Sequence, residues 1–258
     1  MKRVVIIGIG TGHPDHVTVQ GIKALNEADV LFVMDKGSDT EDLVRIRKEI
    51  CAHHITNSSY RFVEVTDPER DRTSPEYRAA VETWHEQRAD VYERLIRDEL
   101  GDDECGAFLA WGDPSLYDST LRIVEQVAAR GSVTFEYEVI PGVSSVHVLA
   151  ARHRIPLNRI GESVHVTTGR NLVHGLPDGV ENVVVMLDGD CAFTKVDLPD
   201  ADIYWGAYLG TDDEILVSGK LADVADEIVR VRDEARARKG WIMDTYLIRG
   251  ATPTRSPR

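Results

Sequence analysis

The first 35 residues contain a strand, a glycine-rich turn, a helix and a second strand, and this order constrains the fold most strongly. Residues 2–9 form a continuous apolar run, which is typical of a strand buried on both faces. Residues 18–28 place apolar side chains at helical spacing, and residues 29–34 form a second apolar run. This βαβ order predicts an α/β protein whose first sheet is parallel, with right-handed crossovers.

Later apolar runs continue the alternation of strands and helices. Strands are expected at residues 60–65, 107–111 and 135–140, and helices at residues 35–51, 75–100, 117–130 and 145–153. After residue 157 the pattern changes to short strand candidates, then a helix and a last strand. We therefore expect two α/β domains, residues 1–158 and 159–250, the first with a mainly parallel sheet, and a disordered tail at residues 251–258.

The composition limits the classes of function. With 258 residues, 42% hydrophobic and 29% charged, the chain has the make-up of a globular protein. It contains no apolar run of about 18 residues, and its basic start leads directly into a strand-like run, so we expect a cytoplasmic protein. The net charge of −14 argues against non-specific nucleic-acid binding. Cys51, Cys105 and Cys191 are isolated in the sequence, which predicts neither disulfides nor a metal site.

Three predicted strands end in a glycine-bearing turn, at residues 8–15, 111–118 and 140–145. The carboxyl ends of parallel strands gather ligands, and glycine lets a ligand approach the backbone. The first turn departs from the dinucleotide fingerprint, because His13 stands where that motif needs its last glycine. Asp35 could still imitate the ribose-binding acid of a nucleotide fold. These residues therefore also permit a nicotinamide-dependent oxidoreductase with a Rossmann-like first domain.

In their order and spacing, these three turns resemble the tetrapyrrole methylase family, over residues 2–249. The resemblance implies two α/β domains with an S-adenosyl-L-methionine cleft between them, a homodimer, and a tetrapyrrole substrate. Residues 30–37, 111–120, 150–161 and 203–210 resemble one branch, which methylates a precorrin in cobalamin biosynthesis and releases an acetyl fragment as acetate. Methylation at a different precorrin position would fit the same turns, and so would a tetrapyrrole-binding protein without catalytic activity.

The resemblance also implies which residues bind the cofactor. They are Gly10, Gly12, Pro14, Gly112, Asp113, Ser115, Tyr117, Ser144, Ser145, Met186, Leu187 and Ala207. The methionine part of the cofactor would meet the loop at residues 112–114 and the two serines at residues 144–145. The adenine would meet the backbone around Met186, Leu187 and Ala207.

Removal of an acetyl group by water would gain from a general base. The candidates are His13, Asp15 and Asp113, followed by Asp35 and His85. The family usually has Asp at the position of His13, and spontaneous loss of the acetyl group would need no base. We expect Asp113 to shape its loop and face the sulfonium rather than to transfer a proton.

A tetrapyrrole substrate carries many carboxylates, and arginine suits bidentate contacts with them. Basic clusters occur at residues 45–48, 70–72 and 152–154, although each could equally form a solvated helix face, most clearly residues 45–48. The charged segment at residues 66–100 lies between two predicted strands. It could cover the cleft as a lid.

Overall fold

The computed structural model describes residues 1–35, 41–69, 77–177, 179–198 and 200–250. The chain divides into two compact units, Met1–Ser144 and Ser145–Arg258. This division falls before the boundary predicted at residue 158, because helix α5 (Ser145–His153) packs on strands β8 (Asp202–Ala207) and β10 (Asp244–Arg249) of the second unit. The tail expected to be disordered lies outside the described residues.

A five-stranded sheet of order β3-β2-β4-β1-β5 forms the centre of the first unit. Its strands are β1 (Lys2–Gly8), β2 (Val30–Asp35), β3 (Arg61–Thr66), β4 (Cys105–Ala110) and β5 (Phe135–Ile140). Every pairing between these strands is parallel, so their carboxyl ends share one edge. The mainly parallel sheet predicted from the apolar runs is confirmed.

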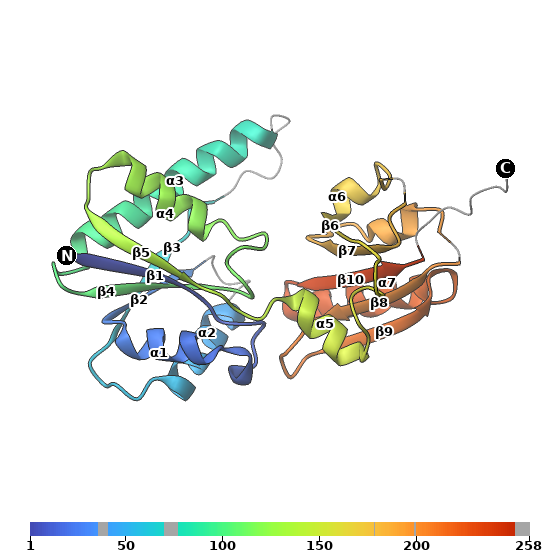
Figure 1. The fold of residues 1–258 in the computed structure, drawn as a ribbon, viewed down its shortest axis with the longest axis horizontal. Helices are drawn as coiled ribbons and strands as arrows, with labels where there is room; N and C mark the ends of the chain where they lie inside the picture. The colour runs from blue at the N-terminus through green and yellow to red at the C-terminus, as the bar shows by residue number, and fades with distance from the viewer. Residues whose placement is uncertain (36–40, 70–76, 178, 199, 251–258) are drawn as a thin grey trace. The chain divides into compact units, whose positions relative to one another are not determined.

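Helices cover both faces of this sheet, as Figure 1 shows. They are α1 (Val19–Glu27), α2 (Glu41–His54), α3 (Tyr77–Asp98) and α4 (Thr120–Arg130), with a short 3-10 helix, η1 (Pro14–His16). Leu25 of α1 and Ile50 of α2 pack with Leu31 of the sheet, whereas α3 and α4 pack on Phe108 from the opposite side. The sheet is therefore buried on both faces, as its unbroken apolar strands require.

Helix α3 is part of the core. Its Tyr92 and Leu95 are buried, and the Tyr92 ring stacks on Phe108 with a distance of 4.2 Å between ring centres. The prediction that this charged segment acts as a lid is therefore wrong for α3, because its apolar side chains cover the sheet and even one of its charged side chains, Arg88, is buried. Residues 70–76 of the segment lie outside the described residues.

The second unit contains a mixed sheet of order β6-β7-β10-β8-β9. Its remaining elements are β6 (Val164–Thr168), β7 (Asn182–Met186), β9 (Ile215–Lys220), α6 (Gly169–Leu172), the 3-10 helix η3 (Ala192–Lys195) and α7 (Leu221–Lys239). Strand β10 runs antiparallel to both β7 and β8. Strands β7 and β8 therefore point the same way and end at the same edge of the sheet.

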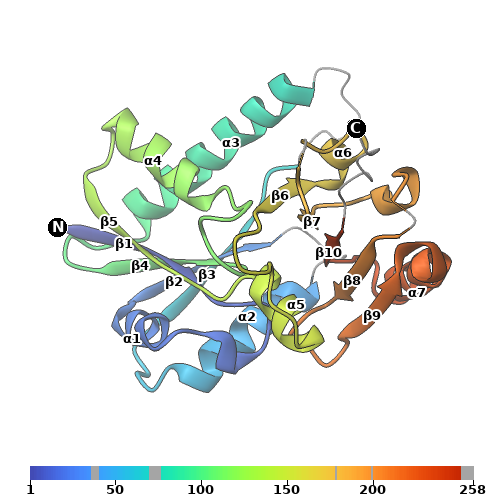
Figure 2. The same ribbon diagram turned by 45° about the vertical axis from the view of Figure 1, so that its right-hand side comes forward.

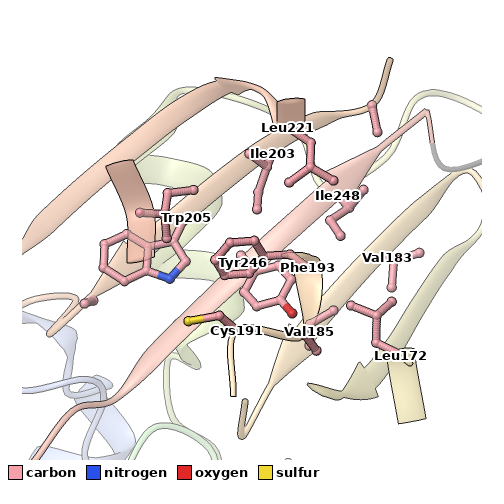
Figure 3. Packing of buried hydrophobic residues seen from close by; sticks show 14 of the residues in the cluster. Leu172, Val183, Val185, Cys191, Phe193, Ile203, Trp205, Leu221, Tyr246 and Ile248 are labelled. Atoms are coloured by element: carbon pink, nitrogen blue, oxygen red, sulfur yellow. The ribbon is translucent and has the colours of Figure 1, made fainter. Parts of the chain in front are cut away.

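The core of this unit contains large aromatic side chains among aliphatic ones. Trp205, Tyr246 and Phe193 are fully buried, and the rings of Phe193 and Tyr246 meet edge to face at 5.3 Å (Figure 3). Helix α7 adds Ile228 to this cluster. On the other face of β8, a Cβ atom at Gly206 would meet a Leu149 methyl of α5 at 2.9 Å, so α5 lies against the backbone of the strand. Figure 2 shows α5 and α7 on the two sides of the sheet.

The described part of the chain contains no helix long and apolar enough to cross a membrane. Within the same ranges, no group of His, Cys, Asp and Glu side chains is placed to hold a metal ion. The three cysteines are free and buried.

Candidate functional site

The turns that follow β1, β4 and β5 meet at one edge of the first sheet. Gly10 N–H donates to the Gly112 carbonyl at 3.3 Å, and Gly112 N–H donates to the Gly10 carbonyl at 2.7 Å. A Cβ atom at Gly142 would lie 2.1 Å from the Gly112 oxygen, so the third turn also packs backbone against backbone. Gly10 and Gly112 have φ angles of +75° and +70°, which glycine adopts without strain. The structure thus brings together the three turns predicted from the sequence.

Asp113 ties two of these turns together. Its Oδ2 accepts a hydrogen bond from Gly142 N–H at 2.9 Å, and its Oδ1 accepts one from Ser115 N–H at 2.8 Å. The Ser115 hydroxyl also contacts Oδ1. Both carboxylate oxygens therefore hold backbone, which favours the loop-shaping role expected for Asp113 over proton transfer. Its contact with a sulfonium stays a prediction.

His13 and Asp15 lie in the exposed part of the first turn. The His13 Nδ1 accepts from Asp15 N–H at 3.1 Å and lies 3.8 Å from the Asp15 carboxylate. Pro14 begins η1, and its carbonyl lies 2.9 Å from His54 Nε2. Gly12 has a φ angle of +121°, which allows the chain to turn between Gly10 and His13. The two candidate bases are thus neighbours, and their catalytic role stays a prediction.

Tyr117 and the two serines occupy the ends of the other turns. Tyr117 has a left-handed backbone, with φ +53°, and the residue is 45% exposed. Ser144 is buried at the end of the first unit, and Ser145 begins α5 in the second. The Ser145 hydroxyl lies 3.1 Å from that of Thr245, the strand partner of Met186. Ser145 therefore contacts β10, the strand that lies between the two strands whose ends are expected to meet adenine.

Met186 and Ala207 end β7 and β8, on either side of the start of β10. Each is followed by a non-glycine residue in the left-handed conformation, Leu187 with φ +53° and Tyr208 with φ +49°. Leu187 is 65% exposed directly after a buried strand. Such backbone strain, which costs about 1–3 kcal/mol per residue, is concentrated at ligand sites. The residues expected to meet adenine thus lie together at one edge of the second sheet.

Comparisons with known proteins place the chain in a family. Residues 3–225 match the model of the Tetrapyrrole (Corrin/Porphyrin) Methylases. This chain belongs to that family. It is 53% identical to a precorrin-6A synthase [deacetylating] from Sinorhizobium sp over 249 residues, which cover 96% of this chain and 95% of the relative.

Solved structures of similar proteins agree with the family assignment. A putative cobalamin synthesis related protein (CobF) from Corynebacterium diphtheriae has a TM-score of 0.84 and 39% identity, covering 97% of this chain and 99% of its own. The uroporphyrin-III C-methyl transferase of Thermus thermophilus, solved with S-adenyl homocysteine, has a TM-score of 0.60 and 18% identity. That alignment covers 96% of this chain and 98% of the transferase chain, and it shows a shared fold.

In this tetrapyrrole methylase, a buried polar network supports the end of β7. Asp188 Oδ2 accepts from the Tyr246 hydroxyl and from Ala192 N–H, both at 2.7 Å, and Oδ1 accepts from Asp190 N–H at 3.0 Å. The Arg232 guanidinium donates to the Asp188 carbonyl at 2.7 Å. The residue next to Leu187 is therefore held by its carboxylate and by its main chain.

A buried ion pair completes this network. Arg232 Nε lies 2.9 Å from the Asp244 carboxylate, which also accepts from the Trp205 indole at 3.1 Å. Burial raises the pKa of Asp244, while the Arg232 charge opposes that rise. Sequence reasoning missed this pair, although Arg232 follows buried Ile228 by four residues and thus lies within the apolar stripe of α7.

Arg88 forms the corresponding pair in the first unit. Its Nε lies 2.8 Å from the Asp67 carboxylate, one Nη donates to the Ser119 hydroxyl at 2.6 Å, and the other donates to the Tyr92 hydroxyl at 3.0 Å. The guanidinium carbon lies 4.9 Å from the centre of the Trp84 ring. Ser119 precedes α4, so this arginine braces the segment that leaves the Gly112 turn. The sequence signal was again an arginine within an apolar stripe.

The basic clusters differ in their partners. Arg45 pairs with Asp42 and Glu49, and Arg152 Nε contacts Glu214. The cluster at residues 70–72 lies outside the described residues. Asp35, the residue that suggested a nucleotide fold, ends β2, and its carbonyl accepts from Asp67 N–H at 2.6 Å. Family membership favours the methylase interpretation over the oxidoreductase one.

The described residues fit S-adenosyl-L-methionine. Adenine needs an apolar surface, which the exposed Leu187 beyond β7 offers. A sulfonium favours carbonyl and carboxylate oxygens, which the turns around Gly10, Gly112 and Asp113 supply. Members of this family use this cofactor.

Proposed function

We propose that this protein is an S-adenosyl-L-methionine-dependent C-methyltransferase that methylates precorrin-5 at C1 and releases acetate, giving precorrin-6A in aerobic cobalamin biosynthesis. The similarity to a precorrin-6A synthase over nearly the full length of both chains carries this proposal. We further propose a cytoplasmic homodimer, as the family resemblance implies. Light scattering at micromolar concentration would measure the oligomeric state.

The cofactor, when bound, supplies an electrophilic methyl group. The chain then has to orient that group and exclude water, because methyl transfer by in-line displacement depends chiefly on positioning. In this proposal, Asp113 keeps the Gly112 turn in place against Gly142, so that its backbone oxygens face the positive charge. The backbone at Leu187 and Ala207 binds the adenine, and the Asp188 network fixes Leu187.

Removal of the acetyl group is a separate hydrolysis. Water attacks the acetyl carbonyl, the bond from that carbonyl to the ring carbon breaks with its electron pair passing to the ring, and acetate leaves. We propose that His13 or Asp15 takes the proton from the attacking water, because both lie exposed beside the Gly10 turn. If the acetyl group leaves without assistance, neither side chain is needed.

The decisive experiment combines the protein with precorrin-5 and cofactor carrying an isotopically labelled methyl group. Mass spectrometry should show a gain of one labelled methyl and loss of the acetyl fragment, with acetate detected in solution. Methyl gain without acetate would assign the enzyme to another precorrin position. Absence of methyl transfer, with retained binding of uroporphyrin III, would indicate a non-catalytic binding protein.

The candidate bases can be tested in the same assay. His13→Gln and Asp15→Asn should slow acetate release by about 10²–10⁴-fold, if that residue is the base, while methyl transfer continues. Lys23→Gln on α1 provides a control for a change in surface charge. Unchanged acetate release in both variants would support spontaneous loss.

A further inference from the structure

Arg47 differs from its basic neighbours on α2 in having no carboxylate within ion-pair distance in the part of the chain that the structure describes. Arg45 is paired with Asp42 and Glu49, and Lys48 lies 2.6 Å from Glu64. Arg47 Nη1 donates to the Leu43 carbonyl at 3.0 Å. The cluster expected to bind substrate carboxylates thus contains two cations already paired with acids and one that is not.

Arg47 is partly buried. Its guanidinium carbon lies 5.6 Å from the centre of the Trp111 ring, and its Nε makes a long hydrogen bond of 3.5 Å to the Leu109 carbonyl. Burial lowers the pKa of Arg47. One turn further along α2, burial raises the pKa of the Cys51 thiol to about 12. A guanidinium removed from water in this way is stabilised by an anion, and carbonyl oxygens replace that anion only in part.

The position of Arg47 relates it to the candidate site. Leu109 lies near the end of β4, and Trp111 immediately precedes Gly112, whose backbone is bonded to Gly10. Asp118, on the segment that follows Gly112, acts electrostatically on Arg47 and raises its pKa, which opposes the effect of burial. Its carboxylate accepts from Thr120 N–H at 2.7 Å, at the start of α4. Arg47 therefore lies at the sheet edge where the glycine turns gather, and no described side chain there neutralises it at contact distance.

We propose that Arg47 binds a ligand carboxylate at this edge. Its Nη2 makes no hydrogen bond to any described residue, and a guanidinium is suited to planar contacts with carboxylates. This proposal rests on the proposed function, in which two ligands carry carboxylates. They are the acidic side chains of the tetrapyrrole and the methionine carboxylate of the cofactor. The tetrapyrrole is favoured because it carries many carboxylates.

The test measures the affinity of the full-length protein for two stable probes. Uroporphyrin III, a polycarboxylate tetrapyrrole, is titrated by fluorescence, and S-adenosylhomocysteine is titrated by calorimetry. Arg47→Met should weaken uroporphyrin binding by about 10- to 100-fold, the loss expected for one charge-assisted hydrogen-bonded contact. Affinity for S-adenosylhomocysteine should not change. Arg45→Met, on the same helix but already paired with acids, is the matched control and should change neither affinity.

The outcomes distinguish a contact between Arg47 and a ligand carboxylate from a purely structural role of Arg47. If Arg47→Met weakens only the binding of S-adenosylhomocysteine, the carboxylate belongs to the cofactor. The same conclusion holds if the wild type binds only S-adenosylhomocysteine and Arg47→Met loses that binding. Equal loss for both probes, loss in Arg45→Met as well, or no loss overturns the proposal. Arg47→Lys retains the charge and should restore part of the affinity, and it replaces Arg47→Met if that variant does not fold. Methylation of precorrin-5 by the wild type is scored separately, so failure of the proposed function is recognised independently.

Discussion

The two units contain a buried arginine each, and the arginines support different kinds of neighbour. Arg88 reaches its neighbours through side chains, because its donors meet the Asp67 carboxylate and the hydroxyls of Ser119 and Tyr92. Arg232 meets the Asp244 carboxylate and the main-chain carbonyl of Asp188. In the second unit, the buried arginine therefore holds the backbone next to Leu187 directly. In the first unit, Asp113 holds the Gly112 loop, and Arg88 supports only the segment that leads from this loop to α4.

The largest effect is expected from Arg232→Met. Removing one partner leaves the Asp244 carboxylate buried without its cation, which costs about 3–5 kcal/mol of unfolding free energy. Urea unfolding measures the loss, and hydrogen exchange should locate it in α7, β10 and the segment after Leu187. Arg230→Met is the control on the same helix, since its pair with Glu234 is exposed. Equal loss of protection in both units would contradict the separate roles of the two arginines.

Arg88→Met should have a somewhat smaller effect. It leaves the buried Asp67 without its cation, but methionine can still pack between the Trp84 and Tyr92 rings, so we expect a loss of about 3 kcal/mol. Hydrogen exchange should increase in α3 and at the start of α4. Arg94→Met, on the exposed side of α3, is the comparison variant. If exchange increases around Leu187 instead, the first unit does not act alone.

Arg88→Lys isolates the geometry of the contact from its charge. An ammonium can remain near Asp67 but cannot also reach the hydroxyls of Ser119 and Tyr92 with the same planar fork, so we expect a loss of about 1–2 kcal/mol. Thermal unfolding of Arg88→Lys and Arg88→Met, measured in parallel, separates the two contributions. Identical losses would show that the planar fork of the arginine is essential.

The smallest expected effect is a pH dependence of Arg232→Met. Burial raises the pKa of Asp244 above its ordinary 3.8, and the variant lacks the cation that opposes this rise. The folded variant then keeps a proton that the unfolded chain has lost, so its stability falls as pH rises through the raised pKa. The stability deficit relative to wild type should be about 1 kcal/mol smaller at pH 5.5 than at pH 8. A deficit that grows on acidification would contradict this assignment.

Local patterns in the sequence predict much of the fold. Buried parallel strands appear as apolar runs, so β1, β2, β4 and β5 could be predicted, together with the glycine turns that follow β1, β4 and β5. The unit boundary was harder to place, because α5 joins the second unit through packing that its own sequence does not reveal. The lid prediction for α3 failed because overall charge was weighed above the spacing of apolar residues.

Site residues distant in sequence could not be paired from one sequence. Asp67 with Arg88 and Arg232 with Asp244 are contacts between separate elements, and only the two arginines gave a signal beforehand, as charged residues within apolar stripes. Asp188 had no local signal, since Asp beside glycine ordinarily indicates a turn.

The close contact among Gly8, Gly112 and Gly142 has a consequence for recognising such proteins. Cβ atoms at Gly8 and Gly142 would lie 2.5 Å and 2.1 Å from neighbouring backbone atoms, so folding alone keeps side chains out, whether or not a ligand ever binds. A descendant that lost its chemistry would still be under pressure to retain these glycines. Their presence therefore identifies the architecture, and exposed turn residues such as His13 are where relatives with different activities should diverge.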